Sequence, residues 1–139
     1  MSLFPIFATT GSGLKANRMW MDAIADNIAN MNTIKPFDQP AFQAKYLKLQ
    51  SVRGEDNDPV GVGGGVEVVG TELGSAEGNL RYDPTSPLAN ADGMVRSPDI
   101  DLSDQMTQLI QAQRSYQLNL TVIDRARESY QQAISIAAR

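Results

Sequence analysis

The chain lacks the residues that most often carry catalysis and metal binding in proteins. It contains no His and no Cys, which excludes thiolate nucleophiles, the commonest general base and zinc sites built on either residue. The acidic pairs Asp56 with Asp58 and Asp99 with Asp101 could do acid–base chemistry, but each pair lies beside Pro or Asn. Solvated loops and helix caps account for them better. We therefore expect no enzyme, no cofactor and no metal site.

The glycine-rich run at 61–65 is a second candidate for chemistry, as a phosphate-binding loop. Dinucleotide-binding loops need Gly at the first, third and sixth positions. The sixth position is Val66 when counted from Gly61, and Val68 when counted from Gly63. No Gly-Lys-Ser or Gly-Lys-Thr follows, so the other phosphate-binding pattern is absent too. We expect a flexible connection in this run.

Residues 90–93, with the sequence Asn-Ala-Asp-Gly, resemble part of a calcium-binding EF-hand loop. When Gly93 is aligned with the invariant glycine, Leu88 occupies the position of the first carboxylate ligand. Asp99 then stands where a bidentate Glu is required. The pattern therefore predicts a turn with Gly93 at positive φ rather than a calcium site.

Charge and hydropathy exclude two further classes of function. The chain has 12 basic and 16 acidic residues, a net charge of −4, and its basic residues form no stripe. Aromatic residues make up only 6% of the chain, so neither phosphate contacts nor base stacking is favoured. No stretch of 18 apolar residues is present, and the first residues have no basic region typical of a signal peptide. We expect no nucleic-acid partner, no membrane span and no cleaved signal.

An unbroken heptad pattern runs through the last third of the chain, and no Gly or Pro interrupts it after Asp99. Pro98 discourages helix before it, and Asp99 or Asp101 can cap the first turn. We predict one helix from about 101 to 137, within a C-terminal segment 99–139. The heptad positions are Met106, Leu109, Gln113, Tyr116, Leu120, Ile123, Arg127, Tyr130, Ile134 and Ala137.

The first 33 residues contain a second heptad pattern, which predicts an N-terminal helical segment 1–33. Gly11 and Gly13 weaken its start, since each costs about 1 kcal/mol relative to Ala in a helix. We expect a firm helix at 14–31 and a frayed or flexible start at 1–13. The heptad positions are Phe7, Thr10, Leu14, Asn17, Met21, Ile24, Ile28 and Met31.

The middle of the chain, 34–98, has a different composition, with most of the prolines and glycines. Short strands are predicted at 66–71 and 80–82, while 41–52 fits either a strand or a short helix. The predicted fold class is therefore mainly α with a small β-rich insert. In it, the two long terminal helices pack as an antiparallel or coiled-coil pair around the middle β domain.

The terminal helices carry more apolar surface than the middle segment can cover, which favours packing between molecules. The polar heptad residues Asn17, Gln113 and Arg127 either select a register or lie at the edge of the stripe; the sequence fits both interpretations. A closed coiled-coil adaptor of the cytoplasm is an alternative function. The predicted assembly residues are Leu14, Met21, Ile24, Ile28, Met31, Met106, Leu109, Tyr116, Leu120, Ile123, Tyr130 and Ile134.

Three parts of the sequence resemble flagellar axial proteins, which include rod and hook subunits. Residues 12–14 and 26–33 are similar to the N-terminal signature of that family. Residues 82–101 resemble the central block, and 105–119 the C-terminal helix, of the FlgC family of proximal rod proteins. The residues that carry this signature are Asn27, Asn30, Thr33, Asp83, Pro84, Asp92, Gly93, Arg114, Tyr116 and Asn119.

The resemblance implies a structural subunit of the proximal flagellar rod, exported by the flagellar type III apparatus without signal cleavage. It further implies polymerisation with the rod proteins FlgB, FlgF, FlgG and FliE, and with further copies of the chain. The terminal helices would pack in the inner layers of a drive shaft that crosses the periplasm and transmits torque for motility. The middle domain would face outward.

Overall fold

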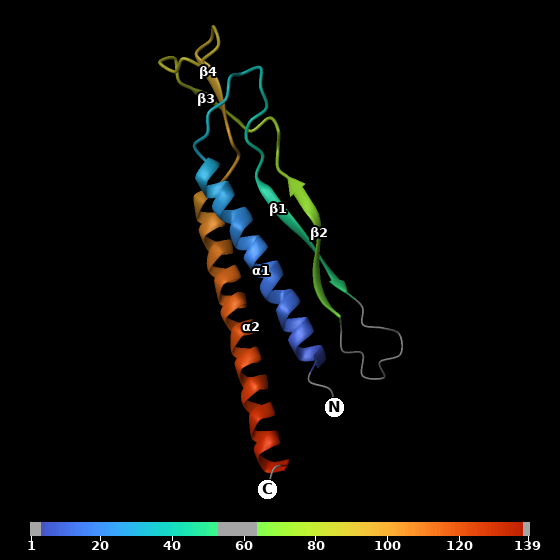
Figure 1. Ribbon diagram of the computed structural model, residues 1–139. Helices are drawn as coiled ribbons and strands as arrows, with labels where there is room; N and C mark the ends of the chain where they lie inside the picture. Colours follow the sequence, from blue (N-terminus) through green and yellow to red (C-terminus); the bar gives the residue numbers. More distant parts are fainter. Residues whose placement is uncertain (1–3, 53–63, 138–139) are drawn as a thin grey trace.

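The computed structural model describes residues 4–52 and 64–137, arranged as two long helices and two small sheets (Figure 1). The acidic pair Asp56 and Asp58 and the glycines at 61 and 63 lie outside the described residues. The predicted fold class is confirmed. The elements are α1 (Phe4–Asn30), β1 (Lys45–Val52), β2 (Gly65–Leu73), β3 (Asn79–Tyr82), β4 (Met94–Ser97) and α2 (Leu102–Ala137).

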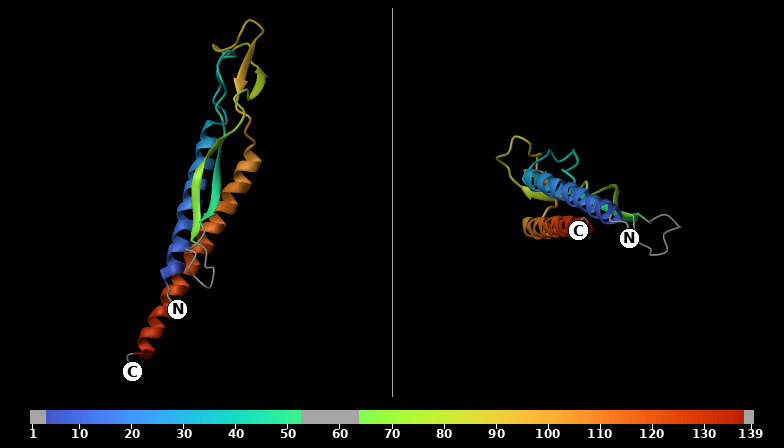
Figure 2. Two further views of the ribbon diagram at one scale, coloured as in Figure 1. Left: turned by 90° about the vertical axis from the view of Figure 1, so that its right-hand side faces the viewer. Right: turned by 60° about the horizontal axis from the view of Figure 1, so that its bottom comes forward.

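Helices α1 and α2 lie side by side and run in opposite directions (Figures 1 and 2). We expected the firm part of the first helix to begin at Leu14, whereas α1 begins at Phe4. Gly13 lies within this helix at a close approach to α2. A Cβ atom at Gly13 would lie 2.9 Å from Nδ2 of Asn119, so the missing side chain allows the two helices to come together.

Asp101, one of the two predicted capping residues, caps the N-terminus of α2. The backbone N–H groups of Ser103 and Asp104 donate to its Oδ1 atom at 2.6 and 3.1 Å. The other member of the acidic pair, Asp99, accepts a hydrogen bond from the side chain of Asn79 at 3.1 Å. Both carboxylates therefore have a local structural role.

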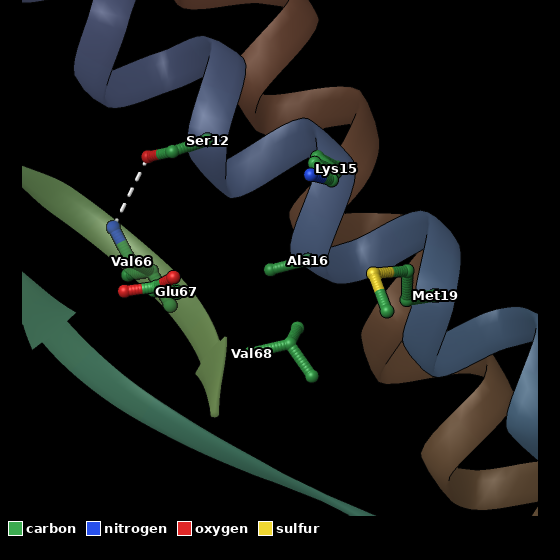
Figure 3. Close-up of a pocket in the computed structure, with 7 residues that line it drawn as sticks. All are labelled: Ser12, Lys15, Ala16, Met19, Val66, Glu67 and Val68. Atoms are coloured by element: carbon green, nitrogen blue, oxygen red, sulfur yellow. Dashed lines mark hydrogen bonds between the residues drawn. The ribbon is translucent and has the colours of Figure 1, made fainter. Parts of the chain in front are cut away.

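Strands β1 and β2 form an antiparallel pair that lies along α1, on the side away from α2 in Figure 1. The undecided segment 41–52 thus contains a strand. The pairing shifts after Lys48, so that Gly70 pairs with Lys48 and Val68 pairs with Leu49. This bulge leaves Val69 as the extra residue. The half-buried Val68 faces α1, as Figure 3 shows.

Strands β3 and β4 form a second antiparallel pair at the end of the molecule opposite both termini (Figure 1). The predicted strand at 80–82 is confirmed, whereas β4 was not predicted. Arg96 of β4 exchanges backbone hydrogen bonds with Lys35, at 2.9 and 3.0 Å. Its side chain donates to the carbonyl oxygens of Phe37 and Glu77, at 2.8 and 2.6 Å. Arg96 therefore ties the loop after α1 to this sheet.

Very few large side chains are fully buried among the described residues. The buried polar residues are Thr10, Asn17, Asn27 and Gln105, four in all. The buried hydrophobic residues are Ala16, Ile24, Ala41, Ala44, Val95 and Ala112. Four of these six are alanines, so the core is thin. Most large apolar residues are half-buried or exposed instead.

Candidate assembly interface

The most buried residues of α2 at its contact with α1 are small or polar. Ala112 and Gln105 of α2 are buried there, and Nδ2 of Asn17 donates to Oγ of Ser115 at 3.0 Å. We name the α2 residues of this contact, Gln105, Ala112, Ser115 and Asn119, the α1-facing stripe. Small residues let helices approach closely but bury little apolar surface. The helix pair inside the subunit therefore leaves most of the apolar surface of α2 uncovered.

The α1-facing stripe differs from the predicted heptad positions of α2. Leu109, Tyr116 and Ile123 are half-buried, whereas Met106, Gln113 and Leu120 are exposed at the side of the stripe. Met106 is 46% and Leu120 40% exposed. The exposed large hydrophobic residues of α2 are Leu102, Met106, Ile110, Leu118, Leu120, Val122, Tyr130, Ile134 and Ile136.

Helix α2 continues past the beginning of α1, as Figure 1 shows. The close pairs Gly13 with Asn119 and Asn17 with Ser115 fix the register, which places Phe4 opposite Glu128. The last nine residues of α2, 129–137, therefore have no α1 residue beside them, and they contain no charged residue. We name this segment the overhang. Its large apolar side chains are exposed: Tyr130 52%, Ile134 52% and Ile136 75%.

The predicted assembly residues of α1 are less exposed than those of α2. Leu14, Met21, Ile28 and Met31 are half-buried. Ile24 is only 1% exposed, so its expected place at a surface between subunits needs correction. Its position faces the interior of the subunit, where it is one of the few large core residues. The prediction did not include Ile6 and Met19, which are exposed apolar residues of the same helix.

The total surface area agrees with this picture of uncovered helices. The chain exposes 9834 Å². A compact monomer of the same mass, 15.1 kDa, exposes about 7,100 Å². The chain therefore exposes more surface than a compact monomer of its mass.

The signature asparagines lie at the end of α1 and hold it to other elements. Asn27 is buried and bonds to Gln105 and to the backbone of Lys45. Asn30 donates to the backbone oxygen of Asp26 at 2.9 Å, and its own carbonyl accepts from the N–H of Thr33 at 2.9 Å. These contacts end the helix and fix where the chain leaves it.

The signature residues of the central block form a tight turn. The N–H of Asp83 donates to the carbonyl of Gly93 at 2.8 Å. Gly93 has φ +74°, as predicted, and a Cβ atom there would lie 3.1 Å from Cβ of Pro84. Asp92 is exposed beside it. The motif therefore shapes a turn. Only Gly tolerates both the positive φ and the close contacts at position 93.

The hydroxyl of Thr85 donates to Oδ1 of Asp83 at 2.8 Å, and this bond lowers the pKa of the carboxyl below its usual 3.8. The Arg81 guanidinium, 3.1 Å from Oδ2, lowers it further. Because folding lowers this pKa, the carboxylate stabilises the turn at pH values above the pKa of Asp83 in the unfolded chain. That stabilisation is lost as the pH falls through the pKa of Asp83 in the folded chain.

We expect the carboxyl carbon of Asp83 to titrate below pH 3.8 in an NMR pH series. Thr85→Val removes the strongest of the lowering contacts and should raise the midpoint towards 3.8. Arg81→Gln should raise it by a smaller amount. A midpoint that does not move in Thr85→Val would contradict the assigned hydrogen bond.

Ser12, another residue of the resemblance, joins α1 to β2. Its Oγ donates to the carbonyl of Thr9 at 2.7 Å. The same Oγ accepts from the N–H of Val66 at 3.1 Å, as Figure 3 shows. Gly65, at φ +101°, packs so closely on Ser12 that a Cβ atom there would lie 2.1 Å from Oγ. Beside this contact is a pocket of about 250 Å³. Its lining includes the charged residues Lys15 and Glu67.

Two remaining signature residues lie on α2. Arg114 is exposed and Tyr116 is half-buried. Within residues 4–52 and 64–137, no group of three or more acidic side chains is arranged to hold a metal ion. Neither helix has a stretch that is both long and apolar enough to cross a bilayer.

Comparison with known proteins gives matches to flagellar proteins along the chain. The family model "Flagella basal body rod protein" matches residues 7–34, and "Flagellar basal body rod FlgEFG protein C-terminal" matches residues 91–136. The flagellar basal-body rod protein FlgC of Bacillus subtilis is 31% identical over 149 residues, covering 98% of this chain and 99% of that protein. The protein of the same name from Salmonella typhimurium is 34% identical over 124 residues, covering 89% and 90%. That of Borreliella burgdorferi is 29% identical over 152 residues, covering 98% of each chain.

Proposed function

The chain belongs to the FlgC family of flagellar basal-body rod proteins and is a structural subunit of that rod, and on this premise we propose how it assembles. In the proposal, the exposed apolar faces of α1 and α2 pack against neighbouring rod subunits. These neighbours are further copies of the chain and the other rod proteins, FlgB, FlgF, FlgG and FliE. The observation that carries the proposal is the row of large apolar side chains along α2, exposed from Leu102 to Ile136.

The energetics favour assembly over an isolated subunit. Burying apolar surface contributes about 25 cal/mol per Å², so each exposed Leu or Ile of α2 can contribute roughly 1 kcal/mol when a neighbour covers it. The nine exposed large hydrophobic residues of α2 lie along the whole helix rather than in one patch. Contacts of this kind that do not close on themselves generate an open helical filament, which can grow along one axis.

We assign three segments to three roles. Residues 1–33 and 99–139 supply the helices that pack in the inner rod, and 34–98 supply the β-rich part that faces outward. The subunit lies in the proximal rod within the periplasm, after export by the flagellar type III apparatus without signal cleavage. Its role is mechanical: it transmits torque and has no catalytic chemistry, in keeping with a chain without His or Cys.

Deletion of the gene in a motile host tests the proposal. We expect loss of swimming, and basal bodies isolated from the deletion strain should lack the rod when inspected by electron microscopy. The unchanged gene supplied in trans should restore both. Complete rods in the deletion strain would rule out this role.

The alternative, a closed cytoplasmic adaptor, predicts different behaviour of the purified chain. A closed coiled coil would form a dimer or trimer of fixed size, whatever the protein concentration. The rod subunit should instead show a mass that grows with concentration. Light scattering across a concentration series separates the two.

A further inference from the structure

A buried pair of amide side chains connects the two helices. Asn27 of α1 is 1% and Gln105 of α2 is 2% exposed. Nδ2 of Asn27 donates to Oε1 of Gln105 at 3.1 Å, a hydrogen bond buried within the subunit. Buried amides that lose their partners are costly, so this pair favours the arrangement in which the two side chains meet.

The same asparagine holds the start of β1. Its Oδ1 accepts from the backbone N–H of Lys45 at 2.8 Å, and its Nδ2 also donates to the carbonyl of Lys45 at 3.0 Å. Asn27 thus bonds to β1 as a residue of a neighbouring strand would. One side chain therefore fixes α1, α2 and the β1–β2 hairpin relative to one another.

The apolar pattern of α2 cannot select this arrangement by itself. Seven residues are close to two turns of helix, so a slip of α2 by seven residues brings nearly the same face of α2 to α1 and leaves the apolar pattern similarly placed. In the slipped arrangement, Ala112 would stand opposite Asn27 and Val122 opposite Asn17, in place of Gln105 and Ser115. Asn17 and Asn27 would then be buried without these partners.

We propose that the Asn27–Gln105 pair selects a single register of α2 on α1. Since Asn27 also holds β1, the pair further determines where the exposed apolar positions of α2 stand relative to the hairpin. This inference concerns contacts inside one subunit. It can therefore hold or fail independently of the proposed place of the subunit in the rod.

Disulfide trapping can read the register directly, because the chain contains no Cys of its own. Asn17→Cys with Ser115→Cys reports the native register, since these two side chains are in contact at 3.0 Å. Asn17→Cys with Val122→Cys reports the seven-residue slip. Both pairs remove the Asn17–Ser115 hydrogen bond, so Asn27 and Gln105 remain as the buried amide pair.

The full chain is used at high dilution, where helix content by circular dichroism matches α1 and α2. Intramolecular cross-links are then followed on gels during mild oxidation. With Asn27 and Gln105 present, we expect the native pair to form about tenfold faster than the slipped pair. With Gln105→Leu added, that ratio should fall to about threefold or less. This variant leaves both bonds between Asn27 and Lys45 in place, so the hairpin remains attached.

Two further variants serve as controls. Gln105→Met is closer to Gln in shape and should lower the ratio of native to slipped cross-linking in the same way. If Gln105→Leu folds poorly, the ratio in Gln105→Met provides the test. Gln111→Leu makes the same chemical change at an exposed position of α2 and should leave the ratio near tenfold. A ratio that stays near tenfold in well-folded Gln105→Leu and Gln105→Met would overturn the proposal.

Discussion

The double substitution Met106→Asp and Leu120→Asp should abolish swimming while the isolated subunit stays folded. Both side chains are exposed in the subunit, so charge there costs the monomer little. In an assembled rod the two carboxylates would be buried without a partner, at a cost of about 3 kcal/mol each. That cost corresponds to more than a hundredfold loss of affinity for each contact. Swimming on soft agar and basal bodies seen by electron microscopy provide the measurement.

Thr107 and Thr121 offer a matched control, because each follows one of the two tested residues directly. Both are exposed and polar, and each is rotated by about 100° around the helix from its neighbour. Aspartate at these two positions adds the same charge at the same spacing without removing a large apolar side chain, and swimming should be impaired less. Normal motility of the Met106→Asp, Leu120→Asp variant, with its subunit present in purified rods, would refute the assembly role of this face.

Gly78→Ala should cause a large loss of stability, although it adds only one methyl group. Gly78 has φ +58°, and its Cβ atom would lie 2.3 Å from the carbonyl oxygen of Ser97 and 2.6 Å from Cβ of Ala41. The backbone of β4 cannot move away without breaking its pairing with β3. We expect a loss of about 3 kcal/mol, seen as a fall of roughly 10 °C in the thermal midpoint.

Gly11→Ala is the appropriate comparison, because a Cβ atom there has nothing within 4 Å and lies on exposed helix. Alanine favours helix, so this variant should gain up to about 1 kcal/mol. The two substitutions add the same methyl group and should move the midpoint in opposite directions. Equal midpoints for both variants would show that the close contacts of Gly78 are relieved by movement of the loop.

The overall architecture could be predicted from the sequence because its signals are local. The heptad spacing predicted both helices, and β-branched residues at 66–71 predicted β2. Asp101 as the cap of α2 and Gly93 at positive φ follow from residue preferences that act within a few positions. By contrast, β4 was missed, since it is short and contains the charged Arg96, whose partners Lys35, Phe37 and Glu77 are distant in sequence.

The side of α2 that faces α1 could not be predicted from the apolar pattern. The pattern assigned Met106 and Leu120 to assembly, and the helices meet beside these residues, at Gln105 and Ala112. Close approach of α1 and α2 depends on small residues and on buried amides that satisfy one another, and a scale of hydrophobicity gives these no weight. The proximity of Asn27 to Gln105 arises from chain folding across 78 positions, which no local signal reveals.

The predicted assembly residues are more exposed on α2 than on α1. Leu120, Tyr130 and Ile134 are exposed, as residues that contact neighbouring subunits must be in the free chain. Ile24 has the same spacing and residue type but is one of the few large core residues of the subunit. A helix with partners on two sides has several apolar stripes, and sequence spacing cannot tell which of them faces inward.

The absence of charge in the overhang, residues 129–137, determines how that end of the molecule responds to its surroundings. Contacts made there release water from apolar side chains and involve no ion pairs, so added salt has little electrostatic interaction to screen. Their strength falls on cooling, and forming them lowers the heat capacity. Raising the temperature, rather than lowering the ionic strength, should therefore strengthen contacts between this end of α2 and neighbouring subunits.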